Sequence, residues 1–255
     1  MSGPHSHALY VHGHTRIHRL APQCKLAAQF LFVIAVVATP REAFWAFGVY
    51  AAMVIALIVA ARLPAGFVAK RLAFEVPFIL FAVLLPFIGR GERVEVFGLS
   101  LSVEGLWGAW NILAKATLGL AISIVVAATT TMPEFLRGFE RLHLPRAFTS
   151  TLSFMIRYTD VIADEMRRMK VARISRGYDP RWLWQAKAVG SAAGALFIRS
   201  YERGERVYLS MLSRGYEGTL PRVDETPATP GMWVGALAFP ALAALVAAVA
   251  WVVAP

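Results

Sequence analysis

Two short runs in the second half of the chain have almost the same sequence, and both contain an arginine followed by a glycine. They are Ser175-Arg176-Gly177-Tyr178-Asp179 and Ser213-Arg214-Gly215-Tyr216-Glu217. Each follows a stretch with helical spacing, and glycine commonly ends a helix in the left-handed conformation. The arginine would then lie in the last helical turn, where a cation complements the negative end of the helix dipole. Helix termination therefore explains either arginine singly.

The duplication needs a second explanation, because two helix ends could use any cation and any residue after the glycine. Arginine is always charged, and its planar guanidinium group can pair with a carboxylate through two hydrogen bonds. Two such groups on two helices would suit two equivalent grooves, for instance on a dimeric partner. The spacing alone leaves both possibilities open, a helix end used twice and a shared docking role.

Residues 132–228, which carry both runs, show helical spacing rather than low complexity. Apolar residues recur every three or four positions in two amphipathic helices; they are Tyr158, Ile162, Met166 and Met169 in the first, and Phe197, Tyr201, Tyr208 and Met211 in the second. We expect an ion pair between Asp164 and Arg168, four residues apart. A shorter helix should begin at Pro133 and end at Pro145. Such helices can dock on a bilayer, on each other or on a partner.

The rest of the chain is suited to a membrane. Hydrophobic residues make up 57% and charged residues only 16%, below the roughly 25% charged residues of soluble domains. Five apolar runs approach the length of about 20 residues that a spanning helix needs. They are Leu26–Thr39, Ala43–Ala61, Leu72–Ile88, Leu106–Ala128 and Met232–Val253. The sequence therefore predicts an all-α membrane protein with about five transmembrane helices plus cytoplasmic amphipathic helices.

The distribution of Lys and Arg predicts the orientation of the chain, because these residues accumulate on the cytoplasmic side. Basic residues flank the first run and separate the second from the third, whereas residues 90–105 also contain acidic residues and turn-forming glycines. We therefore expect residues 90–105 to lie outside. Residues 132–228, which hold most of the basic residues, should be cytoplasmic, and the C-terminus should lie outside. The net charge of +10 then needs no nucleic-acid partner.

Several polar residues are candidates for other chemistry. Lys115 and Asn111 lie within the fourth apolar run, where an ionisable group is a functional candidate, although packing or a subunit contact explains Lys115 better. We expect Glu75, near the start of the third run, to lie at the membrane interface. Cys24 is the only cysteine, so a cysteine-based metal site or an intrachain disulfide is excluded. The chain contains no phosphate-binding loop of the G-x-x-x-x-G-K-[ST] type and no nucleophile motif.

Histidines are concentrated at the N-terminus, where His5, His7, His12 and His14 are weak candidates for a metal site. Closely spaced histidines can bind Ni²⁺ or Cu²⁺, but ordering a flexible tail around a metal costs conformational entropy. We therefore expect no functional metal site in this chain.

Three further motifs carry a family resemblance over nearly the whole chain. They are His18-Arg19-Leu20-Ala21-Pro22, the helix ending at Leu144-Pro145, and the long run from Leu196 to Tyr216 with its Arg199, Glu202 and Arg203. The sequence resembles the T components of energy-coupling factor (ECF) transporters, most closely the CbiQ-like, cobalt-type branch. The signature triplet of that family is Ala-Arg-Gly, and Ser175 and Ser213 replace its alanine here.

The resemblance implies a division into four segments. Residues 1–25 would be a histidine-rich cytoplasmic segment, 26–131 transmembrane helices 1–4, 132–228 a cytoplasmic coupling-helix region, and 229–255 a C-terminal transmembrane helix. The chain would not be an enzyme but a coupling subunit in the cell (inner) membrane. The residues contacting the ATPases would be Ser175, Arg176, Gly177, Ser213, Arg214 and Gly215.

The resemblance also implies partners. Two ATPase subunits would bind ATP, so this chain needs no cofactor, and a separate CbiM-like membrane subunit would capture the substrate. Cobalt is the favoured substrate, whereas nickel, biotin or another vitamin stay open. The main alternative is a permease that itself moves substrate in a conventional ATP-binding cassette importer. Such a permease should have polar groups or broken helices along a path, whereas these runs are largely aliphatic and aromatic.

Overall fold

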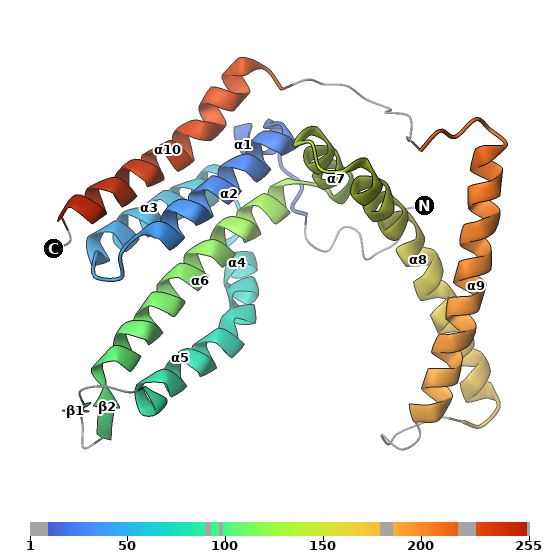
Figure 1. Cartoon of the computed structure of the whole chain (residues 1–255), viewed down its shortest axis with the longest axis horizontal. Helices are drawn as coiled ribbons and strands as arrows, with labels where there is room; N and C mark the ends of the chain where they lie inside the picture. The colour runs from blue at the N-terminus through green and yellow to red at the C-terminus, as the bar shows by residue number, and fades with distance from the viewer. Residues whose placement is uncertain (1–9, 90–92, 97–98, 179–185, 219–227, 254–255) are drawn as a thin grey trace. The chain divides into compact units, whose positions relative to one another are not determined.

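The computed structural model describes residues 10–89, 93–96, 99–178, 186–218 and 228–253 (Figure 1). These residues belong to two compact units. The membrane unit comprises His7–Gly138 and Thr226–Pro255, and the arm unit contains Phe139–Glu225. Both units are helical, and the described strands form only one short hairpin in the membrane unit. The all-α prediction is therefore confirmed.

Five apolar helical segments form the membrane unit. They are α2 (Pro22–Ala38), α3 (Phe44–Ala60), α4 (Ala65–Leu72) continued through the 3₁₀ turn η1 (Ala73–Glu75) into α5 (Val76–Ile88), α6 (Val103–Thr129) and α10 (Pro230–Val253). Among the described residues, Ala65–Ile88, α6 and α10 are long and apolar enough to cross a membrane, whereas α2 and α3 have 17 residues each. The five predicted runs correspond to these five segments.

The third segment begins earlier than its apolar run. The sequence placed its start at Leu72, but α4 begins at Ala65 and includes Lys70 and Arg71. This part of the helix is amphipathic, and Val68 is buried against α6. The apolar run alone missed it, because the charges of Lys70 and Arg71 lower the local hydropathy.

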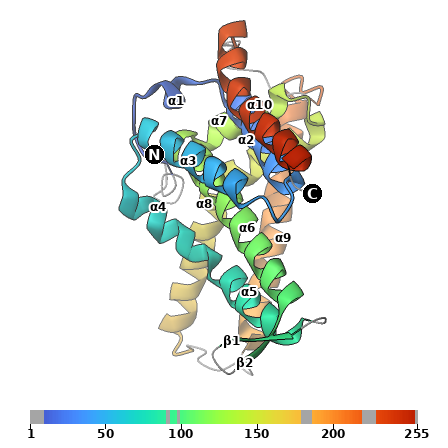
Figure 2. The same cartoon turned by 90° about the vertical axis from the view of Figure 1, so that its left-hand side faces the viewer.

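Helices α2, α3, α6 and α10 lie alongside one another in both views (Figures 1 and 2). Their shared core contains Phe32 and Tyr50, both fully buried. Phe32 packs against Phe239 of α10, with ring centroids 5.0 Å apart. The Tyr50 hydroxyl donates to the backbone oxygen of Ala243 at 3.2 Å and lies 2.8 Å from the Thr39 hydroxyl. The core therefore joins α10, at the end of the chain, to the first two apolar helices.

The C-terminal end of α2 shows what the intramembrane lysine does. Helix ends leave backbone carbonyls without helical partners, and lipid offers no donors for them. Thr39 donates to the oxygen of Ala35 from its hydroxyl, at 2.8 Å, and to that of Val36 from its amide, at 3.3 Å. Lys115 Nζ donates to the Val37 oxygen at 2.8 Å, and Trp251 Nε1 to the Ala38 oxygen at 2.8 Å. Side chains of α6 and α10 thus donate hydrogen bonds to the last backbone carbonyls of α2.

The N-terminal segment is attached to the end of α6 by one buried lysine. Lys25 is 5% exposed, and its ammonium group donates to the backbone oxygens of His18, at 3.1 Å, and Thr129, at 2.7 Å, and to the Thr130 hydroxyl, at 3.4 Å. The short helix α1 (Arg16–Arg19) precedes it. The amide of Val11 also donates to the Ala128 oxygen at 2.9 Å. The His18-to-Pro22 motif therefore lies at this attachment point.

Helices α5 and α6 are antiparallel and are joined by a hairpin. Strands β1 (Arg93–Val96) and β2 (Leu99–Ser102) pair within the connection that the sequence predicted as a loop. The Ser102 hydroxyl caps α6 by accepting from the Gly105 amide. Glu75, expected at the membrane interface, is 5% exposed and accepts a 2.6 Å hydrogen bond from Thr117, near the middle of α6. Glu75 is therefore directed onto α6, and its position at the membrane interface stays a prediction.

The arm unit consists mainly of two long helices. Helix α7 (Met132–Arg141) leads out of the membrane unit, α8 spans Arg146–Ser175, and α9 spans Ala186–Leu212. Pro145 precedes α8 at its N-cap position. The short helix predicted from Pro133 to Pro145 corresponds to α7, which ends earlier, at Arg141. The two Ser-Arg-Gly-Tyr runs therefore lie at the C-terminal ends of α8 and α9.

Candidate functional site

The end of α8 is a Schellman motif built around Gly177. This glycine has a φ of +76°, a conformation that carries a steric cost for residues with a Cβ. Its amide donates to the oxygen of Ile174 at 2.8 Å, and the Tyr178 amide donates to that of Arg173 at 3.2 Å. This pair of hydrogen bonds defines the motif. Arg176 is the helix cap, directly before the turn.

The end of α9 repeats this geometry. Gly215 has a φ of +80°, and its amide donates to the Leu212 oxygen at 3.0 Å. The Tyr216 amide donates to the Met211 oxygen at 3.1 Å, so Arg214 occupies the same position before its glycine as Arg176 does. The prediction that both runs end helices in the left-handed conformation is confirmed. We refer to residues 175–178 as cap 1 and to residues 213–216 as cap 2.

Both caps present their arginine to solvent. Arg176 and Arg214 are exposed, and neither forms an ion pair with a carboxylate in the described part of the chain. The hydroxyl of Ser175 donates to the Val171 oxygen and that of Ser213 to the Ser210 oxygen, each at 3.0 Å. The serines are therefore bonded to their own helices, and a guanidinium group is the charged group that each cap offers.

Exposed apolar side chains occur close to each arginine in the sequence. They are Val171, Ile174 and Tyr178 at cap 1, and Tyr208, Leu209 and Leu212 at cap 2, each at least 42% exposed. Aromatic residues and arginine are enriched in protein-binding surfaces. The composition of each helix end is therefore compatible with binding a protein.

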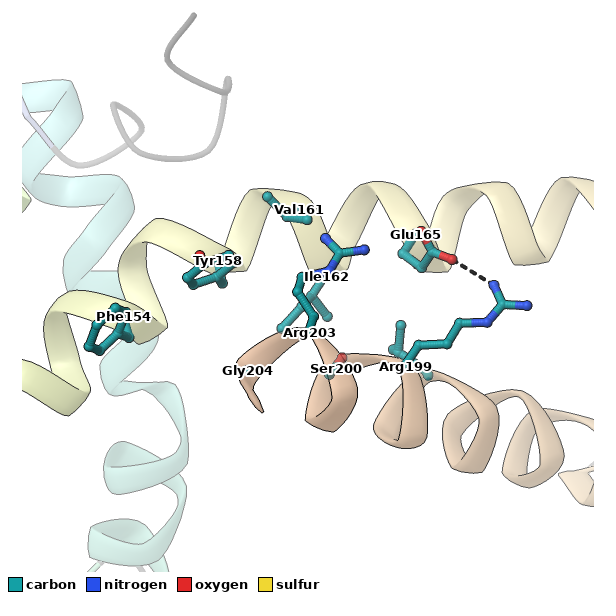
Figure 3. Close-up of a pocket in the computed structure, with 10 residues that line it drawn as sticks. Phe154, Tyr158, Val161, Ile162, Glu165, Arg199, Ser200, Arg203 and Gly204 are labelled. Carbon is teal, nitrogen blue, oxygen red and sulfur yellow. Dashed lines mark hydrogen bonds and ion pairs between the residues drawn. The ribbon is translucent and has the colours of Figure 1, made fainter. Parts of the chain in front are cut away.

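Helices α8 and α9 meet away from the caps. Glu165 Oε1 and Arg199 Nη1 form an ion pair at 2.7 Å, and Figure 3 shows the two helices antiparallel at this point. Arg176 lies eleven residues beyond Glu165, and Arg214 lies fifteen residues beyond Arg199. At 1.5 Å per residue these arms are about 16 and 22 Å long. Because the helices are antiparallel, the two caps point away from the crossing in opposite directions.

The ion pairs of α8 differ from the one that the sequence predicted. Asp164 pairs with Arg167 at 3.1 Å, three residues on, rather than with Arg168. Both side chains are more than half exposed, so this pair contributes little to stability. The ion pair that joins α8 to α9, between Glu165 and Arg199, was not predicted because the two residues are 34 positions apart in the sequence. Local spacing holds no signal for it.

Among the described N-terminal histidines, His18 has a structural role. His5 and His7 lie outside the described residues. Among the residues that the structure describes, no group of three His, Cys, Asp or Glu side chains could hold a metal. His18 instead bonds the Val11 oxygen through Nε2 at 3.1 Å, and its Nδ1 lies 2.7 Å from the Thr15 hydroxyl. Burial lowers the pKa of His18, and the Lys25 charge acts in the same direction.

Comparison with known proteins decides the family. The family model described as "CbiQ: Cobalt transport protein" matches residues 13–225, which include all of α2 to α9. The chain belongs to the CbiQ family. The predicted resemblance to the T components of ECF transporters is thereby confirmed. The apolar helices make the chain a multi-pass membrane protein.

Relatives of this CbiQ-family chain agree with the assignment. It is 29% identical to the energy-coupling factor transporter transmembrane protein EcfT of Bacillus selenitireducens, and 82% of each chain is covered. It is 27% identical to the EcfT of Bacillus subtilis, over 82% of this chain and 83% of that one. It is also 28% identical to a putative fused cobalt transport protein CbiMQ of Methanocorpusculum labreanum, over 56% of this chain and 25% of that protein.

Proposed function

We propose that this chain is the coupling subunit of an ECF-type importer and that cap 1 and cap 2 each bind one of two ATPase subunits. The observation that carries the proposal is the repetition of one cap geometry on two helices, each with an exposed arginine and with exposed apolar residues near it in the sequence. A dimeric ATPase has two equivalent surfaces, which two equivalent caps would match. ATP would be bound and hydrolysed by those subunits, and this chain would transmit their motion.

The intramembrane polar groups support coupling rather than translocation of substrate. Lys115 bonds a helix end, Glu75 bonds Thr117, and Gln29 bonds Ser123 at 2.8 Å. Because these groups are engaged within the protein, they do not form an open polar path. A conventional permease is therefore the less favoured candidate, although the Asn111 side-chain oxygen, which is without a partner, is a group that such a permease could use.

We propose cobalt as the substrate of the whole transporter, with a CbiM-like membrane subunit capturing it. The family description and the fused relative named CbiMQ support this choice. The chain would lie in the inner membrane, with its arms in the cytoplasm. Uptake of labelled cobalt, in competition with nickel and with biotin, tests the substrate separately from the coupling role.

The coupling role is tested by replacing Arg176 and Arg214 with alanine together. We expect co-purification of the ATPase subunits and uptake in cells to fall to background. Replacing Arg168 and Arg206 together, which are exposed arginines on the same two helices, is the matched control and should leave both unchanged. Normal ATPase retention and normal uptake in the Arg176/Arg214 variant would refute the assignment.

A further inference from the structure

The contact between α8 and α9 is incompletely filled. A cavity of about 190 Å³ lies between the helices, lined by Tyr158, Val161, Ile162 and Leu196 among others (Figure 3). The cavity is partly open to solvent, and the Val161 and Ile162 side chains that line it are partly exposed. Fewer packing contacts therefore fix the helix spacing there. The ion pair of Glu165 with Arg199 is the directional contact between the described parts of α8 and α9.

A second guanidinium group faces the same cavity. Arg203 lies one helical turn beyond Arg199 and also lines the cavity. Figure 3 shows its side chain pointing towards α8, beside Ile162. Among the described residues, no carboxylate forms an ion pair with Arg203. One carboxylate on α8 is therefore faced by two arginines on α9, and it bonds one of them.

We propose that Glu165 exchanges between Arg199 and Arg203, which gives α8 and α9 two discrete settings. The first is the setting observed, with Glu165 on Arg199. In the second, α9 is displaced by up to one turn, about 5.4 Å, and Glu165 pairs with Arg203. Both settings contain the same kind of ion pair, and the cavity provides room for the change. Packed helices are known to move between discrete arrangements of this kind rather than deforming continuously.

This inference rests on the proposed coupling function, because the caps lie at the far ends of the same two helices. Displacing α9 by up to one turn would carry cap 2 by up to about 5.4 Å relative to cap 1. An ATPase pair that binds one setting more tightly would shift the population towards it. Glu165, Arg199 and Arg203 would thus be positioning residues for the two caps.

The test measures the distance between the arms by electron paramagnetic resonance. Spin labels are placed at Lys170→Cys and Ser210→Cys, both exposed, in a Cys24→Ala background. The full chain in nanodiscs is measured under three conditions: alone, with the ATPase subunits, and with the ATPase subunits and a non-hydrolysable ATP analogue. We expect two distance populations in the parent. R203Q should retain only the population with Glu165 on Arg199, and R199Q should retain the other.

Two further variants keep the test decisive. R203K preserves a cation and should retain both populations, whereas R206Q, on an exposed arginine that does not line the cavity, should match the parent. A parent distribution with one population under all three conditions would overturn the proposal, as would an R203Q distribution identical to that of the parent. ATPase retention, recorded in parallel, reports on the proposed function: its survival with a single population would overturn only the two-setting inference.

Discussion

Arg176 and Arg214 owe their positions to the glycines that follow them. A helix can end with many residues, but the left-handed turn at Gly177 and Gly215 ends α8 and α9 with the same pair of hydrogen bonds. Each guanidinium group is therefore attached to a defined helix end rather than to a flexible segment. At the scale of single residues, the glycine determines the geometry of the site and the arginine its charge.

Replacing both glycines with alanine tests this division of roles. Each alanine would occupy the left-handed conformation at a cost of about 1–2 kcal/mol, although space is available for its Cβ. We expect the helix ends to fray and ATPase retention to fall severalfold with both arginines intact. Gly194→Ala, within α9 and also with open space around its Cβ, is the control and should retain normal binding. Unchanged retention in the double alanine variant would show that the cap geometry is dispensable.

At the scale of elements, α2 depends on donors from helices that are distant in sequence. Its last carbonyls accept hydrogen bonds from Thr39, from Lys115 of α6 and from Trp251 of α10. Since lipid cannot supply such donors, these side chains determine where α2 ends and which helices adjoin it. The intramembrane lysine thus has a structural role, which agrees with the expectation that packing explains it.

Lys115→Met removes one of these donors and keeps most of the side-chain length. We expect a loss of about 1–3 kcal/mol in stability, because the Val37 carbonyl would lose its donor in a lipid environment that offers no other. Thermal unfolding in detergent measures the change, and Lys70→Met, on an exposed lysine of α4, serves as the control. Equal melting temperatures for the two variants would contradict the capping role.

The N-terminal segment should respond to pH through His18. Its pKa is lower in the folded protein than the ordinary value of 6.5 because of burial, and Lys25 and His14 lower it further, while the hydrogen bond to Val11 and the charge of Glu134 oppose them. The unfolded segment then binds the proton more readily, so its docking is most stable above pH 6.5 and weakens as pH falls below that value.

Hydrogen exchange at the Val11 amide, which donates to the Ala128 oxygen, measures the effect. Protection factors, corrected for the intrinsic pH dependence of exchange, should decrease between pH 7.5 and 5.5. His18→Asn should give a flatter profile. A parent profile as flat as that of the variant would exclude His18 as the cause.

The elements were predictable from sequence to the extent that local chemistry determines them. Both glycine-ended helices were correctly predicted, because turn formers act on their own neighbours. The short helix expected to end at Pro145 ends earlier, at Arg141, and Pro145 instead precedes α8. The start of α4 was not correctly predicted, since an amphipathic segment with Lys70 and Arg71 does not resemble a transmembrane helix. Two features could not be predicted from local sequence patterns: the pairing of Glu165 with Arg199 and the inward position of Glu75. Both depend on how helices that are distant in sequence pack together.

At the scale of the whole molecule, the five apolar segments and the placement of basic residues predict a defined orientation. Single cysteines at Arg41 and Glu95 should react with a membrane-impermeant maleimide in intact cells, whereas those at Gly66 and Glu217 should react only after permeabilisation. Buried Cys24 gives little background. Labelling of Glu217→Cys in intact cells would place the arms on the wrong side for a cytoplasmic ATPase.

The central claim is that each cap holds one ATPase subunit, and native mass spectrometry of the purified complex tests it most directly. We predict two ATPase subunits per chain in the parent and none in the Arg176→Ala/Arg214→Ala variant, with the Arg168→Ala/Arg206→Ala control still binding two. Two ATPase subunits bound to the chain without either cap arginine would contradict the claim.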